Sequence, residues 1–375
     1  MNVIFIKNMY LYCIKNSNLG CLIIFMKNIF FISLIISALY SCKVTENFIS
    51  NPRFSKIIVD TLFTEKISCR ALTIDNNKVW YAANNGNYGF ILLDSSANYS
   101  KQITNENLKI EFRSIAQTSK YIFILSVANP ALLYRISKND YKVTLVYQEN
   151  HEKVFYDSMQ FFNDNEGIAI GDPTENCPSI IKTTNGGETW QKISCEKLPK
   201  FYDGEAFFAA SNTNLVIKRN KIWMISGGKK ARVFYSENKG NTWQTFETPM
   251  VQGQTMTGSF TADFYNQKIG FIAGGNYEKL EQNLQNKATT NDGGKTWQLM
   301  SQNQGFGYAS CLQYVPNSGG KSLVVVSATG IFYSRNAGKK WKKLSSDNDF
   351  YTLRFLNNNT AIAAGKNKIV SIKFK

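Results

Sequence analysis

Four copies of one turn, each ending in tryptophan, constrain this 375-residue chain more than any other feature. They follow the pattern Ser/Thr-x-Asn/Asp-x-Gly-x-x-Trp and lie at residues 183–190, 236–243, 290–297 and 334–341. The tryptophans are 53, 54 and 44 residues apart. That period suits one four-stranded propeller blade and is too long for the common helical repeats. The repeat therefore predicts a β-propeller.

Each turn follows a short apolar strand, such as residues 330–333, and runs into another strand, which predicts a hairpin. Asn and Asp bind their own backbone through side-chain hydrogen bonds, Gly takes the positive φ of the turn, and the indole buries apolar area between sheets. The residues to which we assign these structural roles are Asn185, Gly187, Trp190, Asn238, Gly240, Trp243, Asp292, Gly294, Trp297, Asn336, Gly338 and Trp341.

The four turns resemble the Asp-box, or bacterial-neuraminidase repeat. This repeat occurs in sialidases, in sortilin-type receptors, and in photosystem II assembly factors with their non-photosynthetic bacterial relatives. The resemblance covers roughly residues 55–375. It implies that the boxes lie on the blade rim, away from the ligand. We therefore interpret their Asn and Asp side chains as structural and not as metal ligands.

A second motif, an apolar strand with small residues, recurs seven times between residues 79–83 and 361–365. Seven occurrences predict seven four-stranded antiparallel blades. The segment before each is expected to be the innermost strand of its blade, and these segments centre on Arg70, Arg113, Asp157, Glu205, Ser259, Ser310 and Arg354. The last strand, 368–374, lacks a partner hairpin. We expect residues 57–62 to pair with it and close the ring.

The first 42 residues contain no acidic residue and are dominated by Ile, Phe and Leu. From Met26 they form a basic start, an apolar stretch at 29–39 and the ending Leu39-Tyr40-Ser41-Cys42, which predict an export signal with a lipobox-like end. Cys42 would then be acylated. The alternative interpretations of this segment are an ordinary signal peptide or a single membrane anchor. We predict a signal at 1–42, a tether at 43–54 and a propeller at 55–375, held on the periplasmic or cell-surface side of a membrane.

The chain carries a formal net charge of +16, which becomes +13 without residues 1–42. Such an excess suits an anionic partner, such as lipid headgroups or an acidic glycan. The joint richness in Lys, Asn and Ile is equally consistent with the codon bias of an AT-rich genome. Because no Lys/Arg run exceeds two or three residues and the chain is predicted to be exported, we expect no nucleic-acid partner.

Cysteine and histidine usage bounds the chemistry. Cys177 and Cys195 flank one hairpin and are predicted to form a disulfide in an oxidising compartment. Cys69 and Cys311 fall on expected inner strands, as small buried apolar residues. With one histidine, His151, and no Cys-x-x-Cys, we predict no metal. We also predict no cofactor, because the Gly-rich pieces open no helix.

The mouth of the central channel is the candidate ligand site. Charged groups that converge on a narrow channel are costly to desolvate unless they pair or meet a ligand. A self-paired ring of salt bridges is the structural alternative. The candidate binding residues are Arg70, Arg113, Asp157, Glu205, Arg354, Asp172, Lys229, Lys230, Tyr277 and Lys366.

Two function classes fit this site. The resemblance to the photosystem II assembly factors implies a non-catalytic binding or assembly scaffold, here at the bacterial cell envelope, with an envelope protein or acidic glycan as partner. The basic residues that would engage the partner, matched by blade position, are Arg70, Arg113, Lys229, Lys230 and Arg354. We favour this class and assign no catalytic residue.

The alternative is a sialidase-like glycoside hydrolase. That chemistry needs an arginine triad, a tyrosine nucleophile activated by a glutamate, and an aspartate acid/base. The candidates are Arg70, Arg113, Arg354, Glu205, Asp157 and either Tyr308 or Tyr351. The Phe-Arg-Ile-Pro motif of the sialidases is missing, and residues 112–115 read Phe-Arg-Ser-Ile instead. A further alternative is a propeller of the kind called oxidoreductases, although the sequence contains no recognisable cofactor motif.

Overall fold

The computed structural model describes residues 51–95, 97–105 and 108–375. The predicted signal, Cys42 and residues 43–50 lie outside this range. Within it the chain forms β-strands and one 3-10 turn at Cys195–Lys197. No helix in this part of the chain is long and apolar enough to cross a membrane. The prediction of an all-β structure is confirmed.

The strands form antiparallel sheets, four of which have four strands each. Their orders are β5-β6-β7-β8, β12-β11-β10-β9, β14-β15-β17-β18 and β23-β24-β25-β26. The strands span β5 Phe112–Gln117, β6 Tyr121–Ser126, β7 Ala131–Ser137, β8 Val143–Glu149, β9 Tyr156–Phe161, β10 Gly167–Gly171, β11 Ser179–Thr183, β12 Gln191–Lys192, β14 Leu215–Lys218, β15 Lys221–Ile225, β17 Arg232–Ser236, β18 Gln244–Glu247, β23 Ala309–Tyr314, β24 Leu323–Ser327, β25 Gly330–Ser334 and β26 Lys342–Ser345.

Two further sheets have six strands each. Their orders are β27-β28-β1-β2-β3-β4 and β13-β16-β19-β20-β21-β22. The strands span β1 Ile57–Asp75, β2 Lys78–Ala83, β3 Asn87–Leu92, β4 Asn98–Gln102, β13 Glu205–Ala206, β16 Gly227–Gly228, β19 Thr257–Phe264, β20 Gly270–Asn276, β21 Lys287–Thr290, β22 Gln298–Leu299, β27 Phe350–Phe355 and β28 Thr360–Phe374.

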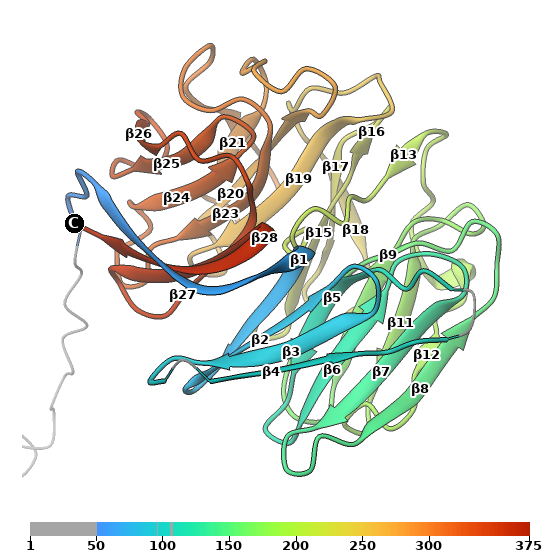
Figure 1. The fold of residues 1–375 in the computed structure, drawn as a ribbon. Helices are drawn as coiled ribbons and strands as arrows, with labels where there is room; N and C mark the ends of the chain where they lie inside the picture. Colours follow the sequence, from blue (N-terminus) through green and yellow to red (C-terminus); the bar gives the residue numbers. More distant parts are fainter. Residues whose placement is uncertain (1–50, 96, 106–107) are drawn as a thin grey trace, which may run out of the picture. The chain divides into compact units, whose positions relative to one another are not determined.

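The innermost strands neighbour one another in chain order within the compact unit Ile49–Lys375. β1 contacts β5, β5 contacts β9, β9 contacts β14, β14 contacts β19, β19 contacts β23, and β23 contacts β27. β27 in turn contacts β1, so the cycle is closed. The sheets fan out from this shared centre (Figure 1). The arrangement is that of a β-propeller.

The prediction of seven blades is wrong, because the described strands group into six hydrogen-bonded sheets. β1, of 19 residues, runs unbroken from the strand expected to complete the last blade into the innermost strand expected for the first blade. β28, of 15 residues, joins two strands that were both expected in the last blade. The pairing between them joins the strands expected for the first and last blades into one sheet. The expected pairing of the chain ends is present, with Ile57 opposite Phe374 and Thr61 opposite Val370. Sequence repeats count strand motifs, whereas backbone hydrogen bonds decide which strands share a sheet.

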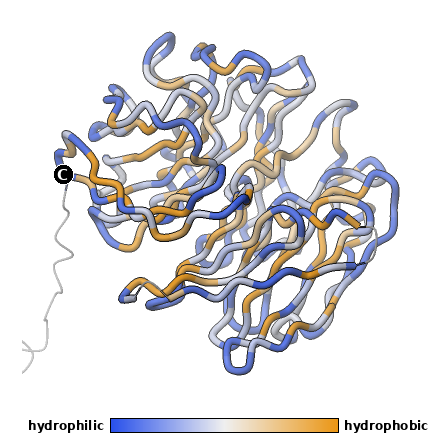
Figure 2. Tube along the Cα trace, viewed as in Figure 1, coloured by the Kyte–Doolittle hydropathy of each residue, from blue (hydrophilic) through white to orange (hydrophobic). Residues whose placement is uncertain are grey.

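The apolar core lies between neighbouring sheets. Trp80 and Phe90, on β2 and β3, belong to one buried cluster with Ile122 and Ile124 on β6 of the next sheet. Apolar residues concentrate along the strands, and hydrophilic residues concentrate in the connecting loops (Figure 2). Because sheet-to-sheet packing buries both faces, strands in the middle of the sheets, such as β6, β10 and β24, are almost continuously buried.

The four tryptophan turns share the same hydrogen bonds. The hydroxyl of the first residue accepts a hydrogen bond from the N–H of the glycine. The Gly187 N–H donates to Thr183 at 3.0 Å, and the Gly338 N–H donates to Ser334 at 3.0 Å. In each copy the Asn or Asp oxygen accepts the N–H of the residue four positions later, at 2.9–3.1 Å. These side chains therefore serve the turn itself, which agrees with the structural role assigned to them.

The turns also join neighbouring sheets. Trp190 packs edge-on against Phe123 of β6, with ring centroids 6.2 Å apart. Trp223 of β15 donates its indole N–H to the Gly293 carbonyl of the next sheet's turn, at 2.7 Å. Gly187 has φ +77°, and a Cβ built on it would lie 2.2 Å from the Phe123 ring. The glycine is therefore required both by the backbone and by the close approach of the sheets.

A disulfide links Cys177 and Cys195, with a Cα–Cα distance of 5.6 Å. It ties the start of β11 to the 3-10 turn that follows β12. Cys69 and Cys311 are free and buried. Burial raises the pKa of the Cys69 thiol to about 12, so this thiol is inert at neutral pH.

We predict that Gly187→Ala lowers the free energy of unfolding by about 2–4 kcal/mol, because it adds backbone strain and a clash with Phe123. The control is Gly253→Ala. Gly253 also has a positive φ, +103°, but a Cβ placed on it would meet no neighbouring atom within 4 Å, so its cost should stay near 1 kcal/mol. Equal losses in urea unfolding would contradict a packing role for the turn.

Candidate functional site

Six inner strands carry a β-bulge at the same level. On β1, Cys69 pairs with Ala83 and Ala71 with Ala82, so the residue between them is extra. The same one-residue shift occurs on β5, β9, β19, β23 and β27. The extra residues are Arg70, Arg113, Asp157, Phe260, Ser310 and Tyr351. A bulge re-aims its side chain, and here it does so at equivalent points of strands that share one centre.

This set, the bulge ring, overlaps with the sequence prediction. Arg70, Arg113, Asp157 and Ser310 were predicted to lie at equivalent inner-strand positions, and each occupies a bulge. In two strands the register differs. Phe260 takes the place expected for Ser259, and Tyr351 takes the place expected for Arg354. Backbone pairing with the neighbouring strand decides which residue is displaced, so the sequence does not reveal it.

A stretch of chain before β14, Ala210–Asn214, fills the centre of the propeller, and we name it the hub segment. The Asn212 amide donates to the Ile115 carbonyl at 2.8 Å and accepts the Met159 N–H at 2.9 Å. The Ser211 hydroxyl donates to the Ser310 carbonyl at 2.6 Å. These bonds reach β5, β9 and β23, so the hub segment binds strands on several sides of the ring.

Two arginines add to these contacts from the sheet that contains β1 and β27. Arg70 donates to the Ala210 carbonyl at 3.1 Å, and Arg354 donates to the Ser211 carbonyl at 2.9 Å. The open channel implied by the sequence analysis is therefore occupied by backbone. The sequence signal for a buried hub segment was the run of polar, uncharged residues at 211–214, because a buried backbone segment needs partners for its polar groups.

Two cavities flank the hub segment. The first, of about 360 Å³, is lined by residues at the beginnings of the inner strands and by 206–210, and we name it the bulge cavity. The second, of about 330 Å³, is lined by residues near the ends of the same strands and by Asn212 and Thr213, and we name it the amide cavity. Because the inner strands run in the same direction, the two cavities lie towards opposite ends of the channel.

The bulge cavity brings together four residues of the predicted site. Arg70, Arg113, Asp172 and Tyr277 line it, together with Phe155, residues 206–210, Thr255, Met256, Phe260 and Tyr308. One wall is aromatic. Phe208 and Phe260 stack with their centroids 3.9 Å apart, and Tyr308 meets Phe260 edge-on at 4.8 Å. Tyr277 is 44% exposed, so its ring is available to a ligand.

The two arginines of the cavity differ in their partners. Arg113 donates from Nε to Oε1 of Glu111 at 2.7 Å, and its Nη2 lies 2.7 Å from the same oxygen in an ion pair. Arg70 has no carboxylate within 4.0 Å in the described part of the chain, and its guanidinium lies 4.0 Å from the centre of the Tyr351 ring. Burial lowers the pKa of Arg70, and nearby Arg113 lowers it further. The cavity thus contains one cation that its own fold leaves without a counter-charge.

Asp157, which is fully buried, and Asp172, which is half-buried and lines the cavity, form an acidic pair near Arg113. Asp157 is fully buried, and neither of its carboxylate oxygens has a hydrogen-bond partner among the described residues. Burial and the neighbouring Asp172 raise the pKa of Asp157 well above its ordinary value, and Arg113 opposes the rise. Burial raises the pKa of Asp172 to about 7, although Asp172 accepts the Phe207 N–H at 2.7 Å. Both carboxyl groups therefore hold a proton to a higher pH than an exposed aspartate does.

The prediction for Glu205 is wrong. Its segment is not the inner strand of a blade, because Glu205 lies on β13, which pairs with β16, and β14 takes the inner position. Arg232 binds Glu205 through two hydrogen bonds, from Nε at 3.0 Å and from Nη2 at 2.6 Å, and both side chains are nearly inaccessible. Glu205 is thus a partner in a buried ion pair, held there because an unpaired buried carboxylate is costly.

The remaining basic residues of the predicted site do not line the bulge cavity. Lys229 pairs with Asp203 at 3.2 Å, and Lys230 pairs with Glu247 at 2.6 Å. Lys366 is exposed outside both cavities. Arg354 lines the amide cavity instead.

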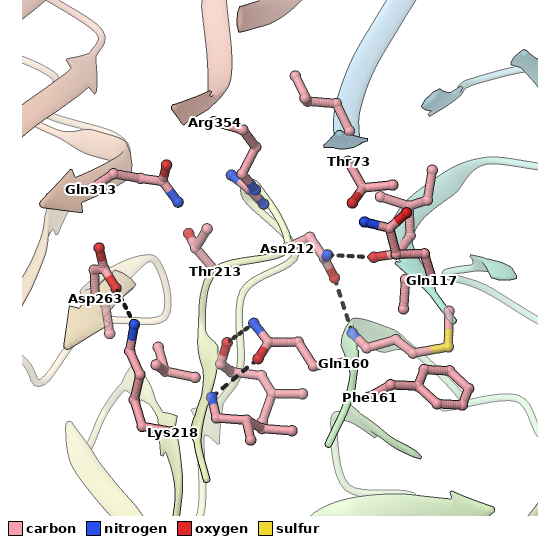
Figure 3. Close-up of a pocket in the computed structure, with 18 residues that line it drawn as sticks. Thr73, Gln117, Gln160, Phe161, Asn212, Thr213, Lys218, Asp263, Gln313 and Arg354 are labelled. Carbon is pink, nitrogen blue, oxygen red and sulfur yellow. Dashed lines mark hydrogen bonds and ion pairs between the residues drawn. The ribbon is translucent and has the colours of Figure 1, made fainter. Parts of the chain in front are cut away.

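The polar groups of the amide cavity are largely satisfied by the protein. Gln160 donates to the Leu215 carbonyl at 2.8 Å and accepts the Ile217 N–H at 3.1 Å, which ties β9 to β14. Asp263 accepts the Tyr314 N–H at 2.8 Å and lies 3.8 Å from Lys218. These side chains face one another around Asn212 and Thr213 (Figure 3). Their polar groups are used to link neighbouring strands, so fewer of them are available to a ligand. This cavity is therefore the weaker candidate for a binding site.

The hydrolase arrangement does not assemble. Glu205 is bound to Arg232, and Arg354 lies at the other cavity from Arg70 and Arg113. Among residues 51–95, 97–105 and 108–375 there is no group of three or more His, Cys, Asp or Glu side chains placed to hold a metal ion.

No family model matches the chain, and the search of curated proteins found no match. Solved structures do share its fold. YCF48 bound to a D1 peptide matches with a TM-score of 0.61 at 12% identity, over 86% of this chain and 98% of that one. YCF48 from Cyanidioschyzon merolae matches with a TM-score of 0.60 at 11% identity, over 85% and 98%.

The GH74 xyloglucanase from Xanthomonas campestris also matches, with a TM-score of 0.58 at 9% identity, over 84% of this chain and 53% of the enzyme. Identities this low establish the fold alone. The chain is a β-propeller, similar in architecture both to peptide-binding and to catalytic propellers.

We predict that Asn212→Ala lowers the free energy of unfolding by about 2–4 kcal/mol, because two buried hydrogen bonds of the hub segment are lost. Asn303→Ala is the control, since Asn303 has a similar φ, +57° against +59°, but is exposed. Its cost should stay below about 1 kcal/mol in chemical unfolding. Similar costs at both positions would argue against a tightly bound hub.

The acidic pair predicts a pH dependence of stability. The folded state holds these protons more tightly than the unfolded chain, so their contribution is complete below about pH 4 and is lost as the pH rises towards 7. Asp157→Asn cannot ionise. Its free energy of unfolding should equal that of the wild type near pH 4. Above that pH the variant should become more stable than the wild type by up to about 1.4 kcal/mol per pH unit.

Thermal unfolding from pH 4 to 8 measures this difference. The control Asp203→Asn changes an almost fully exposed carboxylate and should give a curve parallel to the wild type. A curve parallel to the wild type for Asp157→Asn as well would overturn the assignment.

Proposed function

We propose that this chain is a non-catalytic scaffold that binds a segment of a partner protein in the bulge cavity. The observation that carries this proposal is the bulge ring: six strands each displace one residue at the same level, and Arg70, Arg113 and Phe260 of this set line the cavity. Its volume of about 360 Å³ lies within the range of ligand-binding pockets.

The chemistry of the cavity suits a peptide segment. An aromatic wall of Phe208, Phe260 and Tyr308 offers apolar contact, and exposed Tyr277 offers contact at the rim. Arg70 supplies a positive charge without a counter-ion, which favours a segment bearing a carboxylate. A propeller of similar fold, YCF48, binds a D1 peptide, and this supports the proposal at the level of the fold.

The location follows from the sequence and is part of the same proposal. The ending Leu39-Tyr40-Ser41-Cys42 makes the chain a bacterial lipoprotein, acylated at Cys42 and exported to the periplasmic or cell-surface side of a membrane. Its partner is then a protein of the cell envelope. The compact unit that includes residues 51–375 is the binding domain, and the chain between Cys42 and residue 51 links it to the anchor.

A photo-crosslinking amino acid at Tyr277 tests the proposal in the native envelope. It should capture a protein partner, whereas the same group at Tyr202, which is 54% exposed and outside the cavity, should not. The affinity for the purified partner should fall at least tenfold in Tyr277→Ala, and likewise in Arg113→Gln.

Matched controls are Tyr202→Ala and Lys120→Gln, both at exposed positions away from the cavity lining. Crosslinking to a glycan instead of a protein would change the class of partner. Unaltered affinity in both cavity variants, with folding intact by circular dichroism, would refute binding at this cavity.

A further inference from the structure

A basic face surrounds the residue at which the described chain begins. Asn51 lies in an open hollow of about 470 Å³ whose other lining residues include Lys321, Arg335 and Lys339. All three cations are exposed, and the lining contains no acidic residue. Lys321 precedes β24, whereas Arg335 and Lys339 belong to the tryptophan turn after β25.

The start of the chain is fixed on this face. Ser322 donates its hydroxyl to the side-chain oxygen of Asn51 at 2.9 Å, and Tyr333 donates its hydroxyl to the Pro52 carbonyl. Phe54 is buried and packs on Tyr333, with ring centroids 4.8 Å apart. Whatever precedes residue 51 is therefore attached to the propeller at this point.

Four more cations lie along the same stretch. Arg53 and Lys56 are exposed in the first residues of the described chain, and the Lys375 carbonyl accepts the Lys56 N–H at 3.0 Å. Lys373 lies opposite Ile58 in the pairing of β1 with β28. We define the basic face as Arg53, Lys56, Lys321, Arg335, Lys339, Lys373 and Lys375.

None of these seven cations has a carboxylate within 4.0 Å among the described residues, although ten such ion pairs occur elsewhere in the same part of the chain. Asp60 is the one acidic residue between positions 51 and 60. Ile58 and Val59 are 38% and 42% exposed beside the cations. Unpaired cations next to exposed apolar side chains match the surface of a charged lipid interface.

We propose that the basic face lies against anionic lipid headgroups and orients the propeller on the membrane. This rests on the lipid anchor of the proposed function. Cys42 is nine residues before Asn51, a span of at most about 30 Å. An acyl chain on Cys42 thus holds this face near the bilayer, and the cations then act over a Debye length of about 8 Å at physiological salt.

The test uses the full, acylated protein in two kinds of vesicle, one of phosphatidylcholine and one containing 30% phosphatidylglycerol. A water-soluble acylating reagent followed by mass spectrometry measures the access to single lysines. Lys321 and Lys339 should react at least fivefold more slowly in the anionic vesicles, relative to the exposed reference residues Lys101 and Lys142. The protection should disappear in 0.5 M salt because the attraction is screened.

A triple variant, Lys321→Glu with Arg335→Glu and Lys339→Glu, should abolish the protection of Lys56 and Lys373 in anionic vesicles. The charge-matched control, Lys101→Glu with Lys120→Glu and Lys142→Glu, should retain it. Equal reactivity in both vesicles would overturn the basic face while leaving the anchor intact.

Protection by a soluble acidic polysaccharide but not by anionic vesicles would equally overturn the lipid assignment. The anchor is tested separately with Cys42→Ser. If wild type and variant attach equally well to phosphatidylcholine vesicles, the anchor fails. In that case salt-sensitive protection of Lys321 and Lys339 by anionic vesicles alone would still support the basic face.

Discussion

The pairing of β1 with β28 is the contact on which the rest of the structure depends. A propeller whose ends stayed apart would leave two open sheet edges with unpaired backbone groups. Here residues 57–68 pair with residues 366–374, so the chain ends close the ring. The closure brings the inner strands β1 and β27 into contact. The guanidinium of Arg70, at the bulge of β1, then lies 4.0 Å from the ring centre of Tyr351, at the bulge of β27.

Closure also explains why the centre is filled. A ring of this size leaves a space that inner-strand side chains do not occupy, and the hub segment enters it with its backbone. Asn212 satisfies groups on β5 and β9, while Arg70 and Arg354 cap the carbonyls of Ala210 and Ser211. The positive charges predicted to face a ligand are thus partly used for the fold. The bulge cavity, on one side of the hub segment, remains for binding.

The degree to which the sequence predicted this structure varies with the kind of signal. Local signals were reliable: the four turns form the hairpins expected of them, with the Asn185 and Asp292 side chains bonded within their own turns. The closing strand was found because it lacked a local partner. The bulge positions of Arg70, Arg113, Asp157 and Ser310 were found because each lies at a similar distance before a recurring apolar strand. Glu205 was misplaced because an insertion before β14 carries an acidic residue at nearly the expected spacing.

The sequence alone determined the all-β architecture, the hairpin turns and the partner of the last strand, because each depends on residues near one another or on a period repeated along the chain. Only the tertiary structure decided the number of sheets, the residue displaced at each bulge, the path of the hub segment and the pairing of Glu205 with Arg232. These features arise from hydrogen bonds and charge pairs between distant segments. Their geometry is set only when the ring closes.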